Sequence, residues 1–150
     1  MLAVLAAATP ALAIGQMLGR IGCFLVGDDY GRPSDLPWAV GFPRGLPPTP
    51  PGVRVHPTQL YECAALLLVA WLLIRWRRQG TPDAIVVGRY LVMAGLIRFA
   101  IEFIRVNVRI VGPFTLAGLV SLALAIAGVV ILVFSAGQKP RVAGKITKTR

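Results

Sequence analysis

The chain has 150 residues, of which 56% are hydrophobic and 15% are charged, and its mean hydropathy is +0.71. This is more apolar surface than the core of one small globular domain can hold, so the composition excludes an ordinary water-soluble domain and indicates a membrane protein. A formal net charge of +10 would also suit nucleic acid. The basic residues, however, gather at the ends of apolar segments, where membrane proteins use them for orientation, and we expect no nucleic-acid partner.

Four apolar stretches predict membrane-spanning helices, at residues 2–18, 57–76, 84–104 and 113–134. The last three are each close to the ~20 residues that a helix needs to cross the hydrocarbon. The first contains Pro10 and Gly15, and its Ala11-Leu12-Ala13 resembles a signal-peptidase site. Because no positive residue precedes this apolar run, we expect a retained span, with a cleaved signal segment as the alternative. The predicted fold is an all-α integral membrane protein with four transmembrane helices and a Gly/Pro-rich loop between the first and second.

Basic residues in short connections predict the orientation, because Lys and Arg resist translocation. Arg75, Arg77 and Arg78 follow the second predicted span, and five further basic residues lie in 139–150. We therefore expect both regions on the cytoplasmic side and the loop after the first span on the outer side. The predicted organisation is a transmembrane domain over 1–138 and a basic cytoplasmic tail over 139–150.

The first polar block combines glycines and charges just beyond the first predicted span, in 19–24 and 27–32. Glycine backbones and an arginine fork suit a phosphate group, whereas a plain helix cap and turn is the competing interpretation. Cys23 is expected in this loop and Cys63 in a helix. Neither belongs to a C-x-x-C or His-rich pattern, so we expect no metal site.

A second polar block, 56–62, has the features of a helix start, with Pro57 at the first helical position. Glu62 enters the membrane one turn after Thr58 and near Gln59. An ionisable group at that depth costs several kcal/mol unless it is paired or hydrated, which favours a functional role. The alternative is a glutamate whose carboxylate reaches the interface from the end of the helix.

The third block places Arg98, Glu102 and Arg105 at i, i+4 and i+7, as one charged stripe on an apolar helix. Lipid cannot accept such a stripe, so it should face the bundle or a wet cavity. We expect Glu102 to neutralise one arginine and to leave the other free for an anionic ligand. A structural ion pair between helices and a small transporter subunit are the competing interpretations.

Three ordered blocks carry a family resemblance: GRIGCFLVGDDYGRP from Gly19, VHPTQLYE from Val55 and IRFAIEFIR from Ile97. With the hydropathy between them, they resemble the C-terminal part of the bacterial prolipoprotein diacylglyceryl transferases over residues 1 to about 138. The resemblance implies transfer of a diacylglyceryl group from phosphatidylglycerol to the lipobox cysteine of a prolipoprotein, within the inner membrane, at its outer side and without a cofactor. A truncated, non-catalytic lipid-binding member of the family is the alternative.

The resemblance also implies the site residues. Arg20 and Arg98 would hold the lipid phosphate, Asp28 takes the place of a usual glutamate, and Gly31 closes the first motif. The expected substrate-binding residues are Arg20, Gly22, Asp28, Gly31, Gln59, Tyr61, Arg98 and Arg105, and the expected catalytic residues are His56, Glu62 and Glu102.

The chain departs from the family pattern at two places and in extent. Cys23 and Val26 stand where the best-known members have asparagine. Family members have about seven spans, and the chain begins within what resembles the fourth, after a histidine motif to which the family assigns a catalytic role. The proton of the attacking thiol would then pass to His56, Glu62 or Glu102.

Overall fold

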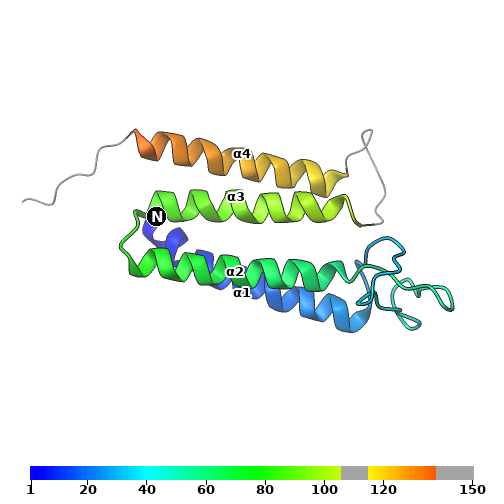
Figure 1. Ribbon diagram of the computed structural model, residues 1–150. Helices are drawn as coiled ribbons and strands as arrows, with labels where there is room; N and C mark the ends of the chain where they lie inside the picture. Colours follow the sequence, from blue (N-terminus) through cyan, green and yellow to red (C-terminus); the bar gives the residue numbers. More distant parts are fainter. Residues whose placement is uncertain (106–114, 138–150) are drawn as a thin grey trace, which may run out of the picture.

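The computed structural model describes residues 1–105 and 115–137, which form four α-helices and their connections. The helices are α1 (Leu2–Val26), α2 (Thr58–Arg78), α3 (Asp83–Glu102) and α4 (Leu116–Ala136). Successive helices run in opposite directions along an elongated bundle (Figure 1). Each is long and apolar enough to cross a membrane. The predicted all-α fold with four spanning helices is therefore confirmed.

The first helix is longer than predicted. We expected the span to end at Leu18, but α1 continues to Val26, and Gly27 closes it in the left-handed conformation (φ 74°) with its N–H bonded to the Cys23 carbonyl. The prediction of a loop at Gly19, and of Cys23 within that loop, is wrong. The glycines before Gly27 do not stop the helix, and Arg20 consequently projects from a rigid element.

The bundle is built as two helix pairs that meet along α3. α1 packs mainly on α2 and α4 mainly on α3, and α3 also contacts α1 and α2. Small side chains at Ala6 and Ala13 allow α1 to lie against its neighbours, since both are fully buried. The core cluster that joins the first three helices consists of Ala6, Ala13, Val69, Ala70, Leu73, Val86, Val87 and Tyr90.

Glycines set the close approach of α3 and α4. A Cβ atom at Gly95 would lie 2.6 Å from the Ser121 carbonyl oxygen, and one at Gly128 would lie 2.7 Å from the Gly88 carbonyl oxygen. The two backbones are therefore in direct contact, as in other membrane helix pairs with small interfacial residues.

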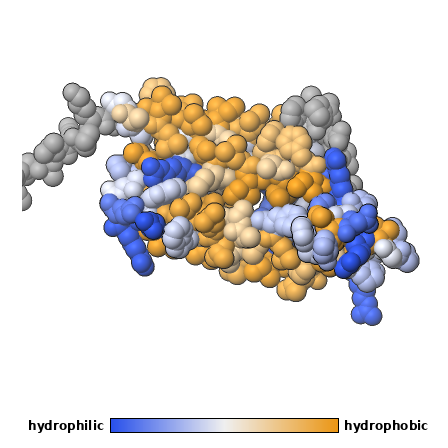
Figure 2. Space-filling model, viewed as in Figure 1, coloured by the Kyte–Doolittle hydropathy of each residue, from blue (hydrophilic) through white to orange (hydrophobic). Residues whose placement is uncertain are grey.

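Polar residues gather toward the two ends of the bundle and apolar residues cover its middle (Figure 2). The connection 27–57 lies where α1 ends and α2 begins (Figure 1), and a bridge between Gly31 and Arg105 ties it to the chain after α3. Arg75, Arg77 and Arg78 are in the last turn of α2, at the opposite end. Pro113, where the fourth span was predicted to begin, and the predicted tail 139–150 lie outside the described residues.

We predict that Gly128→Ala destabilises the protein by about 1–3 kcal/mol, because the new methyl group overlaps the α3 backbone. Thermal unfolding in detergent measures the change. Gly15→Ala is the matched control: no atom lies within 4 Å of the position that its Cβ would occupy, and alanine stabilises a helix by up to about 1 kcal/mol relative to glycine. Equal melting temperatures for the two variants would contradict the packing of α3 on α4.

Candidate functional site

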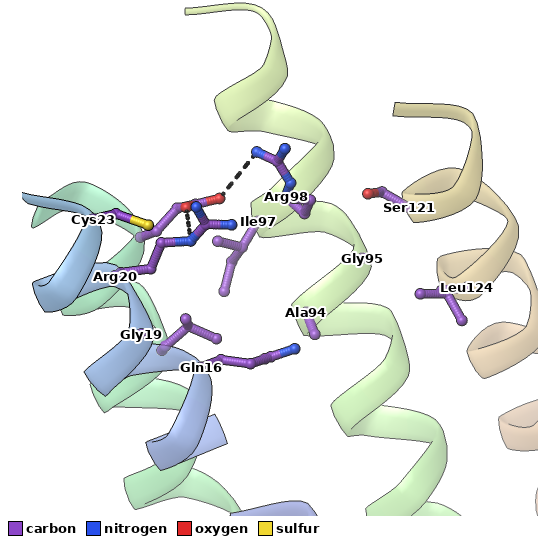
Figure 3. A pocket seen from close by; sticks show the side chains of 12 residues that line it. Gln16, Gly19, Arg20, Cys23, Ala94, Gly95, Ile97, Arg98, Ser121 and Leu124 are labelled. Carbon is purple, nitrogen blue, oxygen red and sulfur yellow. Dashed lines mark hydrogen bonds and ion pairs between the residues drawn. The ribbon is translucent and has the colours of Figure 1, made fainter. Parts of the chain in front are cut away.

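Glu62 lies between two arginines from two other helices. Its side chain is in the second turn of α2 and is 4% exposed. Oε2 lies 2.5 Å from Arg20 Nε of α1, and Oε1 lies 3.3 Å from Arg98 Nη1 of α3 (Figure 3). Because the carboxylate is paired on both sides, it is stable among apolar helices, and it joins α1, α2 and α3 at one point.

The ion pairs continue from this centre in both directions. Arg98 Nη2 lies 3.2 Å from Glu102 Oε2, which confirms the predicted pairing of these two residues. Arg20 Nη1 lies 3.1 Å from Asp29 Oδ2, and the other Asp29 oxygen pairs with Arg105. Three guanidinium groups and three carboxylates thus alternate in one cluster, which we call the ion cluster: Arg105, Asp29, Arg20, Glu62, Arg98 and Glu102.

The predicted charged stripe is only partly correct. α3 ends at Glu102, so Arg105 lies beyond the helix and does not continue its face. We expected one arginine of the stripe to be left free for an anion, but Arg105 is 6% exposed and pairs with Asp29. Sequence spacing could not reveal this carboxylate, because it comes from a loop 76 residues earlier in the chain.

Burial lowers the pKa of Arg105, as does the nearby Arg98 guanidinium, whereas Asp29 opposes the shift. The ordinary pKa of arginine is so high that the group keeps its charge. Its Nε and Nη1 atoms are buried and have no hydrogen-bond partner among the described residues.

A cavity of about 380 Å³ opens beside the ion cluster, between α1, α2, α3 and α4 (Figure 3). Arg20, Glu62 and Arg98 line one part of it. The two arginine side chains are 22% and 23% exposed, so they still reach the cavity despite their ion pairs. The rest of the wall is largely apolar or small and includes Leu66, Ala94, Gly95, Ile97 and Leu124. The space can therefore hold a molecule with an anionic group and an apolar body.

Side chains from the first turn of α2 bind the backbone of the turn that carries Asp29. Gln59 donates from Nε2 to the Asp28 carbonyl, and Thr58 donates from Oγ1 to the Asp29 carbonyl at 2.8 Å. Asp29 is in the left-handed region (φ 59°), which aspartate tolerates better than most residues. A Cβ atom at Gly31 would lie 2.8 Å from His56 Cβ, so this glycine is needed for close packing.

Of the predicted site residues, only Arg20, Glu62 and Arg98 belong to the cavity wall, and His56 and Tyr61 contact each other outside it. His56 Nδ1 is 3.3 Å from the Tyr61 hydroxyl, which accepts a hydrogen bond from Trp38 Nε1 at 2.8 Å. The Tyr61 hydroxyl thus connects the His56 ring to the Trp38 indole in one hydrogen-bonded group. Among the described residues, neither His56 nor Tyr61 is part of the cavity wall. Gly22, also predicted, is an exposed position of α1 with no atom within 4 Å of where a Cβ would lie.

The sequence interpretation missed Asp29, Thr58 and Thr115 as members of the site. Thr115 donates to Glu102 Oε1 at 2.6 Å from the start of α4. These residues have no helical spacing to the charged positions that they contact. Asp29 and Thr58 at least lay in polar blocks that were singled out, 27–32 and 56–62, whereas no sequence signal pointed to Thr115.

The donor atoms of Cys23, Asp28 and Asp29 lie within 4.8 Å of one another. Both carboxylate oxygens of Asp29 already face arginines. This leaves two uncommitted donors, fewer than the three or four protein ligands of a zinc site, and we assign no metal there.

The chain is similar to known proteins over most of its length. A family model described as prolipoprotein diacylglyceryl transferase matches residues 1–134. The chain is 36% identical over 123 residues to the phosphatidylglycerol–prolipoprotein diacylglyceryl transferase of Finegoldia magna, covering 81% of this chain and 46% of that protein. It is 37% identical over 129 residues to the protein of the same name from Methylococcus capsulatus, covering 82% and 47%. For Pseudoalteromonas translucida the identity is 35% over 143 residues, covering 90% and 52%.

The chain thus spans about half the length of the curated relatives that it matches. The family match covers α1, α2, α3 and α4 up to residue 134, and it includes all six residues of the ion cluster. On this basis the chain belongs to the prolipoprotein diacylglyceryl transferase family.

Proposed function

We propose that the chain takes part in transferring a diacylglyceryl group from phosphatidylglycerol to the lipobox cysteine thiol of a prolipoprotein in bacterial lipoprotein biosynthesis. The observation that carries the proposal is Glu62 paired with both Arg20 and Arg98 at the wall of a cavity in the membrane bundle. The names of the relatives support the same reaction, since each contains both substrates.

A phospholipid matches the cavity, because the wall has charged residues in one part and is largely apolar in the rest. Its phosphate would lie at Arg20 and Arg98, whose guanidinium forks bind phosphate oxygens in pairs. Its acyl chains would lie along Leu66 and Leu124 or leave between the helices toward the surrounding lipid. Two ion pairs, Arg20–Asp29 and Asp29–Arg105, connect Arg105 to the cavity wall, so we propose that it acts on the phosphate through Asp29 and Arg20.

We propose Glu62 as the base for the reaction. The thiol proton passes to a Glu62 oxygen, the sulfur forms a bond with the glycerol carbon, and the carbon–oxygen bond to the phosphate breaks. The electron pair of that bond leaves on the phosphate oxygen, releasing glycerol phosphate. Glu62 thereby loses its negative charge and the phosphate gains one. Arg20 and Arg98 pair with the Glu62 carboxylate before the step and with the new phosphate charge after it.

Position favours Glu62 over the other two predicted catalytic residues. His56 lies outside the cavity wall and contacts Tyr61 instead. Glu62 lines the cavity, whereas Glu102 is not among the residues of its wall and is held by Arg98 and Thr115. We propose that Glu102 positions Arg98, and that Asp28, Gly31 and Gln59 act by supporting the Asp29 turn. Tyr61 and Gly22 have no assigned contact with the lipid.

We propose that the ion cluster faces the outer side of the inner membrane and that the C-terminus is cytoplasmic. Arg75, Arg77 and Arg78 lie at the end of the bundle opposite to the cluster. Basic residues favour the cytoplasmic side, which supports a position of the cluster and of the connection 27–57 on the side where a secreted prolipoprotein is accessible.

The second candidate function is lipid binding without catalysis. It is favoured by the cavity itself, whose arginines and apolar wall suit a phospholipid whether or not a bond of the lipid is broken. Membranes that contain the chain, phosphatidylglycerol and a lipobox peptide distinguish the two functions. Thioether product in mass spectrometry supports transfer, whereas specific phosphatidylglycerol binding without product supports the second function.

We predict that Glu62→Gln lowers the transfer rate by about 10²- to 10⁴-fold, because the amide cannot accept the thiol proton. Phosphatidylglycerol affinity should be unchanged or higher, since the carboxylate that competes for Arg20 and Arg98 is gone. Rate and affinity are measured separately by product formation and lipid titration. His56→Gln is the control and should lose less than about tenfold in rate; the opposite ranking of the two variants would make His56 the base.

We predict that Arg98→Ala weakens phosphatidylglycerol binding by about tenfold to a hundredfold, the effect of removing one charged hydrogen-bond donor. Arg89→Ala is the matched control on the same helix, because the Arg89 guanidinium lies over the Trp76 ring at 4.4 Å and not at the cavity. Titration of each variant with phosphatidylglycerol in nanodiscs measures the difference. Equal affinities for the two variants would contradict binding of the lipid phosphate at the ion cluster.

A further inference from the structure

We propose that Thr115 is a positioning residue of the site: its hydroxyl group orients Glu102, and through Glu102 the Arg98 guanidinium that faces the cavity. The inference rests on the proposed function, because it takes phosphatidylglycerol as the ligand of Arg98. It extends that function to α4, a helix whose described residues carry no charged side chain.

Thr115 makes two hydrogen bonds with one oxygen atom. As the N-cap of α4, Oγ1 accepts a hydrogen bond from the Gly118 N–H at 3.0 Å. The hydroxyl proton is donated to Glu102 Oε1 at 2.6 Å. A threonine hydroxyl has one proton and two lone pairs, so both bonds form at once. The residue is 7% exposed, and water therefore does not compete strongly for either bond.

The two oxygens of Glu102 have different partners. Oε1 accepts from Thr115, and Oε2 lies 3.2 Å from Arg98 Nη2. Because the first oxygen is fixed, the second is held at one place and the guanidinium has a defined orientation. Arg98 uses its other terminal nitrogen for Glu62, so its plane is determined from both sides. The N-terminus of α4 adds partial positive charge beside the Glu102 carboxylate, which keeps it near Thr115.

Capping alone does not require the second bond. An aspartate or serine at the N-cap satisfies the Gly118 N–H as well as threonine does. The short bond to Glu102 needs a hydroxyl donor at this position, and of these two residues only serine supplies one. Substitutions can therefore separate the cap from the orientation of Arg98.

The experiment compares Thr115→Ser, Thr115→Asp and Thr115→Val in the full chain. Serine keeps both bonds, aspartate keeps the cap but places a carboxylate against Glu102, and valine loses both. Gly118→Ala is a neighbouring control, because its Cβ would make ordinary contacts of 3.4 Å with Thr115 Oγ1 and 3.6 Å with Glu102 Cγ. Three quantities are measured: the melting temperature, the affinity for phosphatidylglycerol in nanodiscs against phosphatidylcholine, and the ¹⁵N NMR signals of the Arg98 guanidinium without added lipid, assigned by their loss in Arg98→Lys.

We expect Thr115→Val and Thr115→Asp to bind phosphatidylglycerol about three- to tenfold more weakly, the effect of one lost hydrogen bond. Both should shift the Arg98 signals. Both should also melt at a lower temperature, Thr115→Val because the cap is lost and Thr115→Asp because its carboxylate repels Glu102. Thr115→Ser should match the parent chain in all three. Gly118→Ala should match it in lipid affinity and in the Arg98 signals, with a melting temperature that is equal or higher because alanine favours a helix over glycine. Unchanged Arg98 signals in Thr115→Val and Thr115→Asp would overturn the inference. If the parent chain does not distinguish the two lipids, the proposed function fails, and the NMR signals still decide the role of Thr115.

Discussion

The pairing of Glu62 with Arg20 and Arg98 is the interaction on which the rest of the structure depends. A carboxylate this deeply buried among apolar helices is tolerated only with charged partners, and removing one partner of such a pair costs about 3–5 kcal/mol. The pairing fixes the relative positions of α1, α2 and α3 at one level of the bundle. Elsewhere along the bundle, the helices are held together by apolar packing. Ala6 and Ala13 pack in the core, and glycines bring α3 and α4 into contact.

The ion cluster is nearly neutral as a whole, because three arginines alternate with three carboxylates. This arrangement makes a set of charges stable within the membrane without a ligand. It also differs from a site with surplus positive charge: an arriving phosphate must share guanidinium groups that Glu62 already holds. A reaction that removes the charge of Glu62 as it adds charge to a phosphate uses this arrangement directly, since the electrostatic field of the two arginines is needed before and after the step.

The sequence predicted the four helices because an apolar stretch of about 20 residues, folded as a helix, matches the thickness of the membrane hydrocarbon. It did not predict where α1 ends, because the sequence does not tell which of Gly19, Gly22 and Gly27 closes the helix. In the structure, of these three only Gly27 adopts the left-handed conformation of a helix cap. The Arg98–Glu102 pair followed from helical spacing. The partners of these residues outside the helix could not be found in this way, since Asp29 and Thr115 lie on other segments and meet the charged residues only after folding.

The distance between a lipid phosphate and the two arginine side chains tests the central claim most directly. Solid-state NMR measures it as dipolar coupling between the ³¹P nucleus of phosphatidylglycerol and the ¹⁵N nuclei of the Arg20 and Arg98 guanidinium groups, with lysine variants for assignment. The account predicts that one phosphate is coupled to both side chains. Coupling to neither side chain, or coupling of each to a different phosphate, would contradict it.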